Sequence, residues 1–167
     1  MKILVAGVGN VLRSDDGFGV EVANRLLADE HPDQVSVVEA GIAGIQLIQE
    51  LQDGYDAVIV IDTVDRGRPP GTVLVIDYDV LDVHDLDHNE KYDLLADMHL
   101  ATPERSLMVA RALGVLPPIV RMVGVQPVDV ESPAIGLSDL VAGAIEPAMV
   151  EVRRCVDVLL RADRPHD

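Results

Sequence analysis

Hydrophobic residues occur along the chain in short continuous runs that alternate with stretches of helical spacing. Runs rich in Val, Ile and Leu predict strands, and apolar positions three and four residues apart predict helices. The predicted strands cover residues 2–6, 35–39, 57–61, 73–76 and 119–125. The predicted helices cover residues 19–27, 45–51, 103–113 and 137–160, the last with a kink or break at Pro147.

This alternation predicts an α/β fold, a three-layer α/β/α sandwich around a mainly parallel five-stranded sheet. No internal repeat or linker divides the chain, so we expect one domain over residues 1–160 and a frayed tail over 161–167. Ligands of such sheets bind beyond the carboxyl ends of the strands, where the strand order reverses. If strand 35–39 lies outside the first strand, strands 2–6 and 57–61 are neighbours. Asp16 and Asp62 then share one crevice.

The loop after the first strand contains two glycines, Gly7 and Gly9, and then Asp15 and Asp16. A glycine turn in this place is typical of a phosphate cradle, but paired carboxylates favour a cation instead. A dinucleotide-binding fold is an alternative, in which Glu39 at the end of the second strand would hold a ribose. Leu12 stands at the third fingerprint position, where that fold needs Gly or Ala, and this weakens the alternative.

The loop also has an interpretation without any ligand. Asp16 and Gly17 form a tight turn in that case, and Asp15 caps the following helix. The carboxyl end of the third strand is open to the same interpretation, with Asp62 as a turn former.

Charge and cysteine content narrow the class of protein. The chain has 29 acidic and 13 basic residues and a formal charge of −16, so nucleic acid and anionic membranes are poor partners. Cys155 is the only cysteine, which indicates a reducing, cytosolic compartment. Its apolar spacing predicts a core position, and Ser138 has the position of a helix N-cap. Neither is predicted to be a nucleophile. We also expect no signal peptide or membrane-spanning helix.

Asp16, Asp62 and His99 form a candidate open site for a divalent transition metal. His99 precedes the helix 103–113 and could close over the crevice, although a solvated loop histidine is the alternative. Two carboxylates and an imidazole do not by themselves discriminate among nickel, zinc, manganese and iron. His84 and His88 could share a helical face, but their acidic neighbours favour a hydrated loop.

Several motifs together resemble the signature of the nickel-iron hydrogenase maturation endopeptidases. The first combines Gly7-Val8-Gly9-Asn10-Val11-Leu12 with Asp15-Asp16-Gly17-Phe18-Gly19. The others, in the family's order, are Ile61-Asp62-Thr63 ahead of Pro70-Gly71, His99 before a helix, Gly124-Val125-Gln126-Pro127 and Gly136-Leu137-Ser138.

The resemblance implies an endopeptidase that removes a C-terminal extension from a hydrogenase large-subunit precursor after nickel insertion. It assigns metal binding and catalysis to Asp16, Asp62 and His99, with nickel, the precursor's own ion, as the metal and other divalent ions as substitutes. We expect a cytosolic monomer whose partner is that precursor. A non-catalytic, metal-dependent docking module is a further alternative. Asp16→Asn and Asp62→Asn should abolish processing with little change in stability, because both positions are taken as exposed loops.

Overall fold

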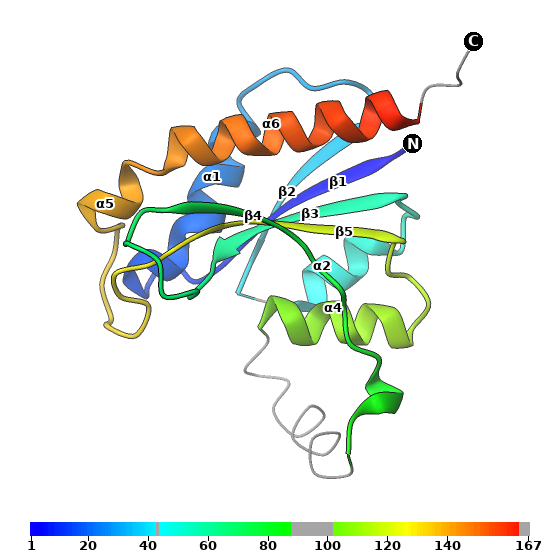
Figure 1. Ribbon diagram of the computed structural model, residues 1–167, viewed down its shortest axis with the longest axis horizontal. Helices are drawn as coiled ribbons and strands as arrows, with labels where there is room; N and C mark the ends of the chain where they lie inside the picture. The colour runs from blue at the N-terminus through cyan, green and yellow to red at the C-terminus, as the bar shows by residue number, and fades with distance from the viewer. Residues whose placement is uncertain (43, 88–101, 164–167) are drawn as a thin grey trace.

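The computed structural model describes residues 1–42, 44–87 and 102–163. Its five strands form one sheet in the order β2-β1-β3-β5-β4, and every neighbouring pair is parallel except β4 with β5 (Figure 1). The predicted mainly parallel sheet is thus confirmed, with one antiparallel edge. The strands are β1 (Ile3–Val8), β2 (Val35–Gly41), β3 (Ala57–Thr63), β4 (Val73–Asp77) and β5 (Ile119–Val125).

Helices cover both faces of the sheet, so the predicted three-layer sandwich is also confirmed (Figure 1). Helices α1 and α6 pack on one face, and α2 and α4 pack on the other. The helical elements are the short 3-10 helix η1 (Ser14–Gly17), α1 (Phe18–Leu26), α2 (Gly44–Leu51), the 3-10 helix η2 (Val83–Asp85), α4 (Pro103–Ala112), α5 (Asp139–Ala142) and α6 (Ile145–Ala162).

The central strand β3 is covered by helices on both faces, which accounts for its continuous run of apolar residues. Ile59 and Ile61 belong to the core beneath α1 and α6, whereas Val58 and Val60 belong to the core beneath α2 and α4. Successive side chains of a strand point to opposite faces, so each face needs its own apolar set. Strand β3 is consequently packed between two cores up to the point where Asp62 ends the apolar run.

The last predicted helix is divided, but not at the proline. The break lies at Gly143 and Ala144, between α5 and α6. Pro147 is the third residue of α6, where its missing N–H removes no intrahelical hydrogen bond. The predicted interruption is therefore confirmed, and its predicted position is wrong.

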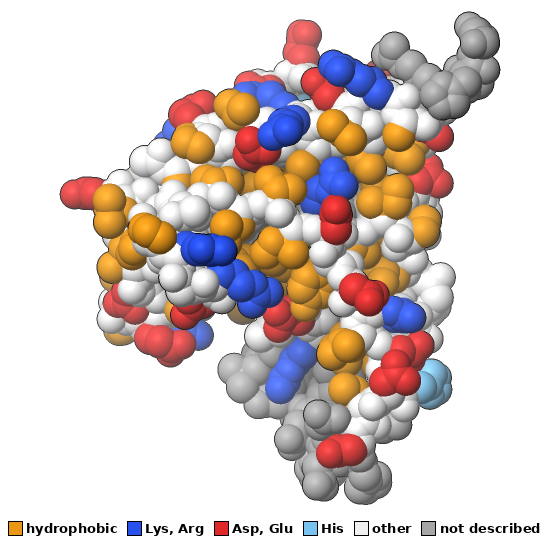
Figure 2. Space-filling view, viewed as in Figure 1, with side chains coloured by type: hydrophobic (Ala, Val, Ile, Leu, Met, Phe, Trp, Pro, Cys, Tyr) orange, Lys and Arg blue, Asp and Glu red, His pale blue; other side chains and the backbone are white. Residues whose placement is uncertain are grey.

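Other local predictions are confirmed by the structure. Thr102 caps α4 through its hydroxyl oxygen, which accepts a hydrogen bond from the Arg105 amide at 3.4 Å. Cys155 is buried in the core beneath α6. In the described ranges, no helix is both long and apolar enough to cross a membrane. On the face shown in Figure 2, basic side chains are scattered among acidic and hydrophobic ones.

Candidate active site

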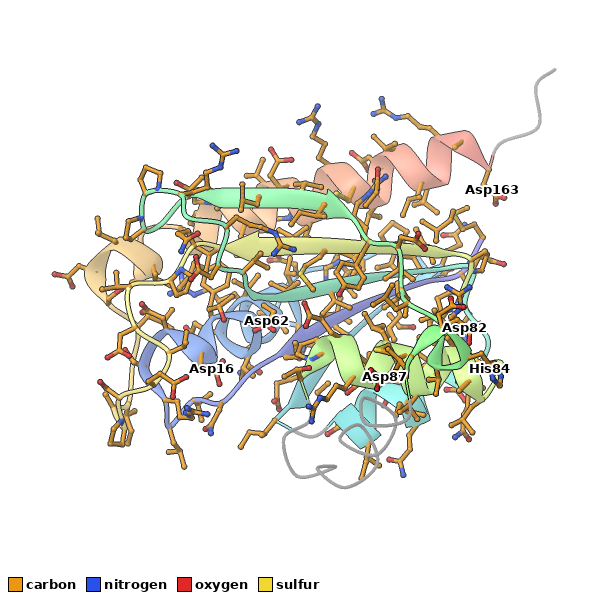
Figure 3. All side chains as sticks on the ribbon, turned by 60° about the horizontal axis from the view of Figure 1, so that its bottom comes forward. Asp16, Asp62, Asp82, His84, Asp87 and Asp163 are labelled. Carbon is orange, nitrogen blue, oxygen red and sulfur yellow. The ribbon has the colours of Figure 1, made fainter. Side chains whose placement is uncertain are left out.

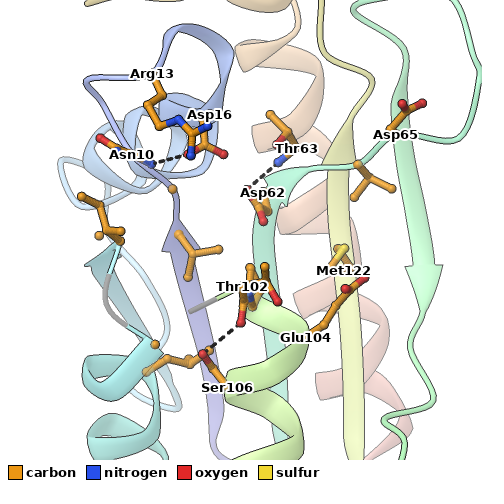
Figure 4. A pocket seen from close by; sticks show the side chains of 18 of the residues that line it. Asn10, Arg13, Asp16, Asp62, Thr63, Asp65, Thr102, Glu104, Ser106 and Met122 are labelled. Atoms are coloured by element: carbon orange, nitrogen blue, oxygen red, sulfur yellow. Dashed lines mark hydrogen bonds between the residues drawn. The ribbon is translucent and has the colours of Figure 1, made fainter. Parts of the chain in front are cut away.

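A pocket of about 480 Å³ opens beyond the carboxyl ends of β1 and β3 (Figure 4). Because β2 lies outside β1, the two strands are adjacent and parallel, as expected for that arrangement, so their following loops face each other. Helix α4 supplies the opposite wall through its first turn. Polar lining residues include Asn10, Asp16, Asp62, Thr63, Thr102 and Glu104.

Asp62 enters the pocket from the end of β3 and is almost completely buried, with 8% of its surface exposed. Its Oδ1 accepts a hydrogen bond from the Thr63 amide at 2.7 Å. Burial raises the pKa of Asp62 well above its ordinary value, and the charges of Asp16 and Glu104 add to this effect against the Thr63 hydrogen bond. A cation in the pocket would offset both the burial and the repulsion.

Asp16 enters the same pocket from η1, on the loop after β1. Its Oδ2 accepts a hydrogen bond from the Asn10 amide at 3.2 Å. Burial raises the pKa of Asp16, although the Asn10 hydrogen bond and the positive charge of Arg13 oppose the shift. Two carboxylates from segments far apart in the sequence therefore line one pocket, and the pKa of each is raised, which favours the protonated form.

The third predicted ligand cannot be placed in this pocket, because His99 lies outside the described residues. In the described part of the chain, Asp16 and Asp62 form no salt bridge. Nor do the described residues include a group of three or more His, Cys, Asp or Glu that could hold a metal ion. The roles of Asp16, Asp62 and His99 in metal binding and catalysis stay predictions.

The glycine loop has a geometry that disfavours the dinucleotide alternative. Gly9 has a φ of 139°, and a Cβ there would collide with the carbonyl oxygen of Asp16. The Asn10 amide, which a phosphate loop would direct at its ligand, donates instead to the backbone and the side chain of Asp16. The glycine thus lets the loop close on its own carboxylate, not on a pyrophosphate.

Asp15 has a role that the sequence did not reveal. Its side chain is completely buried and accepts hydrogen bonds from the amides of Val128, Asp129 and Ser138 at 2.7–3.1 Å. The Ser138 hydroxyl also donates to Asp15, at 3.1 Å. Burial raises the pKa of Asp15, but these hydrogen bonds lower it below its ordinary value overall. The possible helix-capping role of Asp15 is therefore wrong, and Ser138 occupies an N-cap position without capping α5 through its side chain.

Asp15→Asn should lower the free energy of unfolding by about 2–4 kcal/mol. Asp15 accepts four hydrogen bonds, one on Oδ1 and three on Oδ2, and the amide nitrogen of Asn cannot accept those made to the oxygen that it replaces. Urea unfolding of the purified protein measures the change, with Asp33→Asn in an exposed loop as the control. Equal unfolding midpoints for the two variants would contradict the structural role of Asp15.

The pair His84 and His88 is only partly described. His84 belongs to η2 and lies near Asp82, away from Asp16 and Asp62 (Figure 3). Its backbone amide donates to the Asp82 carboxylate at 2.9 Å. His88 lies outside the described residues. Of this pair, then, His84 is not part of the pocket.

Other residues around the pocket were not predicted from the sequence. Glu104 lies in the first turn of α4, and Asp65 and Arg66 lie in the loop after β3. The position of Glu104 directly after a proline at the start of a helix was the available signal, because helix starts commonly face ligands. Nothing in the local pattern around Asp65 and Arg66 indicated that their loop folds over the strand ends.

Comparisons with known proteins agree with this architecture. The family model for HycI hydrogenase maturation proteases matches residues 20–154. The hydrogenase expression/formation protein HupD of Rhodobacter capsulatus is 34% identical over 155 residues, which are 92% of this chain and 70% of HupD. The hydrogenase 2 maturation protease of Escherichia coli is 31% identical, with 91% of this chain and 88% of that protein covered.

A solved structure shows the same relationship in three dimensions. The hydrogenase maturating endopeptidase HybD of Escherichia coli superimposes with a TM-score of 0.72 at 29% identity, and the match covers 94% of this chain and 93% of HybD. Family model, sequence relatives and fold coincide over nearly the whole chain. The chain therefore belongs to the hydrogenase maturation protease family.

Proposed function

We propose that this protein cuts a C-terminal extension from the large-subunit precursor of a nickel-iron hydrogenase after nickel has been inserted. Asp16, Asp62 and His99 complete the coordination of the nickel that the precursor already carries. Only a loaded precursor then docks in the geometry that leads to cleavage. The observation that carries the proposal is the meeting of Asp16 and Asp62, two carboxylates without a salt bridge in the described residues, in one pocket.

The electrostatics of the pocket support a cationic ligand. Each carboxylate is disfavoured in its charged form by burial, and the charge of Asp16 further raises the pKa of Asp62. A divalent ion held between them would reverse that penalty, because opposite charge favours ionised carboxylates. Thr102, three residues after His99 in the sequence, lines the same pocket, which supports keeping His99 as the third ligand.

The volume of the pocket also supports a ligand as large as a short peptide segment. Its volume of about 480 Å³ falls within the range of roughly 300–1,000 Å³ that is typical of ligand sites. Cleavage adds water across the scissile amide, so that a new carboxylate and a free amine result. A divalent ion can assist by polarising the carbonyl or by acidifying a bound water. We further propose that the enzyme acts as a monomer in the cytosol.

Cleavage of metal-free and nickel-loaded precursor tests the proposal. Purified protein is mixed with each form, and the masses of the products are determined by mass spectrometry. We expect loss of the C-terminal extension from the nickel-loaded form alone. Equal cleavage of both forms would refute nickel-dependent recognition while retaining the protease.

The same measurement distinguishes a non-catalytic docking module from an endopeptidase. A module that binds the loaded precursor without cutting it leaves the precursor mass unchanged, although the two proteins associate. Association without mass loss, under conditions in which a related maturation protease cuts its own precursor, would replace the endopeptidase proposal.

A further inference from the structure

A buried glutamine directly after β5 has no part in the proposed chemistry. Gln126 belongs to the Gly124-Val125-Gln126-Pro127 motif, and only 6% of its surface is exposed. A buried side-chain amide requires partners for both its oxygen and its nitrogen. The partners of Gln126 all lie in one segment, the loop between β3 and β4.

The side chain of Gln126 binds four consecutive residues of that loop, directly or through Asp65. Its Oε1 accepts hydrogen bonds from the amides of Arg66 at 2.8 Å and Arg68 at 3.1 Å. Its Nε2 donates to Oδ1 of Asp65 at 2.9 Å. The same Oδ1 accepts from the Gly67 amide at 3.0 Å. One amide group thereby fixes the curvature of residues 65–68.

Backbone hydrogen bonds continue the clamp at both ends of the loop. The Gln126 amide donates to the Thr72 carbonyl at 2.9 Å, and the Gly71 amide donates to the Gln126 carbonyl at 2.9 Å. On the other side, the Val64 amide donates to the Val125 carbonyl at 2.8 Å. The end of β5 therefore holds the loop where it leaves β3 and where it enters β4.

The clamped loop forms a wall of the pocket. Thr63, Val64, Asp65 and Arg66 line it, directly after Asp62, whereas Gln126 does not. Figure 4 shows Asp65 and Thr63 on the side of the pocket that continues from Asp62. Asp62 itself lies in β3, which is paired with β1 and β5 on its two sides. Loosening the loop should thus disturb the wall while the carboxylate stays in place.

We propose that Gln126 is a positioning residue that pre-forms this wall for the peptide segment of the precursor. The inference rests on the proposed function, because it assigns the wall to binding of that substrate. A wall ordered in advance leaves the binding free energy for contacts with the peptide, whereas a loose loop must be ordered at the expense of affinity. Gln126 therefore acts on substrate binding more than on the chemical step.

Gln126→Met tests this, because Met has a similar length but none of the hydrogen-bonding groups. We expect KM for precursor cleavage to rise roughly tenfold, since loop ordering then opposes binding, with kcat changed by less than about twofold. Amide hydrogen exchange should accelerate at Arg66 and Arg68 and stay slow in β3 and β5. Gln52→Met, at an exposed position before β3, is the matched control and should change neither.

Several outcomes would overturn the inference. An unchanged KM despite faster exchange at Arg66 and Arg68 would show that the wall does not serve binding. Unchanged amide hydrogen exchange would disprove the clamp. A fall of kcat at constant KM would show that Gln126 affects the chemical step instead of substrate binding. If Gln126→Met does not fold, Asp65→Ala removes the other side chain of the clamp at an exposed position and should raise KM about two- to threefold. Failure of the wild-type protein to cut the precursor refutes the proposed function instead.

Discussion

Asp62→Asn should reduce precursor cleavage at least ~100-fold. Mutation of a residue that only supports a metal ligand already lowers metal affinity or activity roughly 10- to 100-fold, and loss of a ligand itself should cost more. Asn retains the oxygen that accepts the Thr63 hydrogen bond, so the local backbone has no reason to move. What it loses is the negative charge aimed at the cation. Mass spectrometry of the nickel-loaded precursor after incubation with the variant measures the loss. Cleavage at the wild-type rate would remove Asp62 from the proposed site.

The stability of this variant should differ from what the sequence predicted. Asp62 is buried and not part of an exposed loop, so the reason given for a small effect is wrong for this residue. The folded protein favours protonated Asp62, and wild-type stability therefore falls as pH rises from the unfolded pKa of about 4 to the raised folded pKa. Asn does not titrate. Metal-free Asp62→Asn should thus melt at a higher temperature than wild type at neutral pH, and the gap should close below about pH 4.

Gly19→Ala should lower the free energy of unfolding by about 3 kcal/mol or more, or prevent folding. Gly19 is the second residue of α1, and the helix approaches the sheet so closely that a Cβ would collide with the carbonyl oxygens of Val8 and Ile61. Both obstacles are backbone atoms of paired strands, which cannot rotate aside as a side chain can. Urea unfolding measures the loss.

Gly143→Ala is the matched control for this prediction. A Cβ at Gly143 would lie 3.4 Å from the Asp139 carbonyl oxygen and 3.5 Å from that of Leu140, which are ordinary contacts. We expect its unfolding free energy to stay within about 0.5 kcal/mol of wild type. Similar losses for both variants would contradict the close approach of α1 to β1 and β3.

The strands and their mainly parallel arrangement were within reach of the sequence for a local reason. Continuous apolar runs such as Ala57 to Ile61 reflect burial on both faces, and alternating helices force parallel neighbours. The same logic brought Asp16 and Asp62 to one crevice. It placed the helix break wrongly because Pro147 is compatible with a first helical turn, and the pattern does not show where that turn begins.

The family resemblance carried the functional prediction further than periodicity could. Motifs around Asp16, Asp62 and Gln126 indicated a hydrogenase maturation endopeptidase, and the comparisons show that family. They did not assign a task to each motif residue. For Asp15 the sequence offers only a possible helix-capping role, and for Gln126 it offers none.

Periodicity and motif order in the chain by themselves determined the layers, the sheet, the neighbouring carboxylates and the family. Tertiary structure alone decided what Asp15 and Gln126 do, since their partners lie 113 to 123 and 58 to 61 residues away along the chain. The physical reason is that strand and helix patterns record which face of an element is buried, a local property. A buried carboxylate or amide that joins two loops leaves no periodic trace, because most of its partners are backbone amides, which every residue except proline possesses.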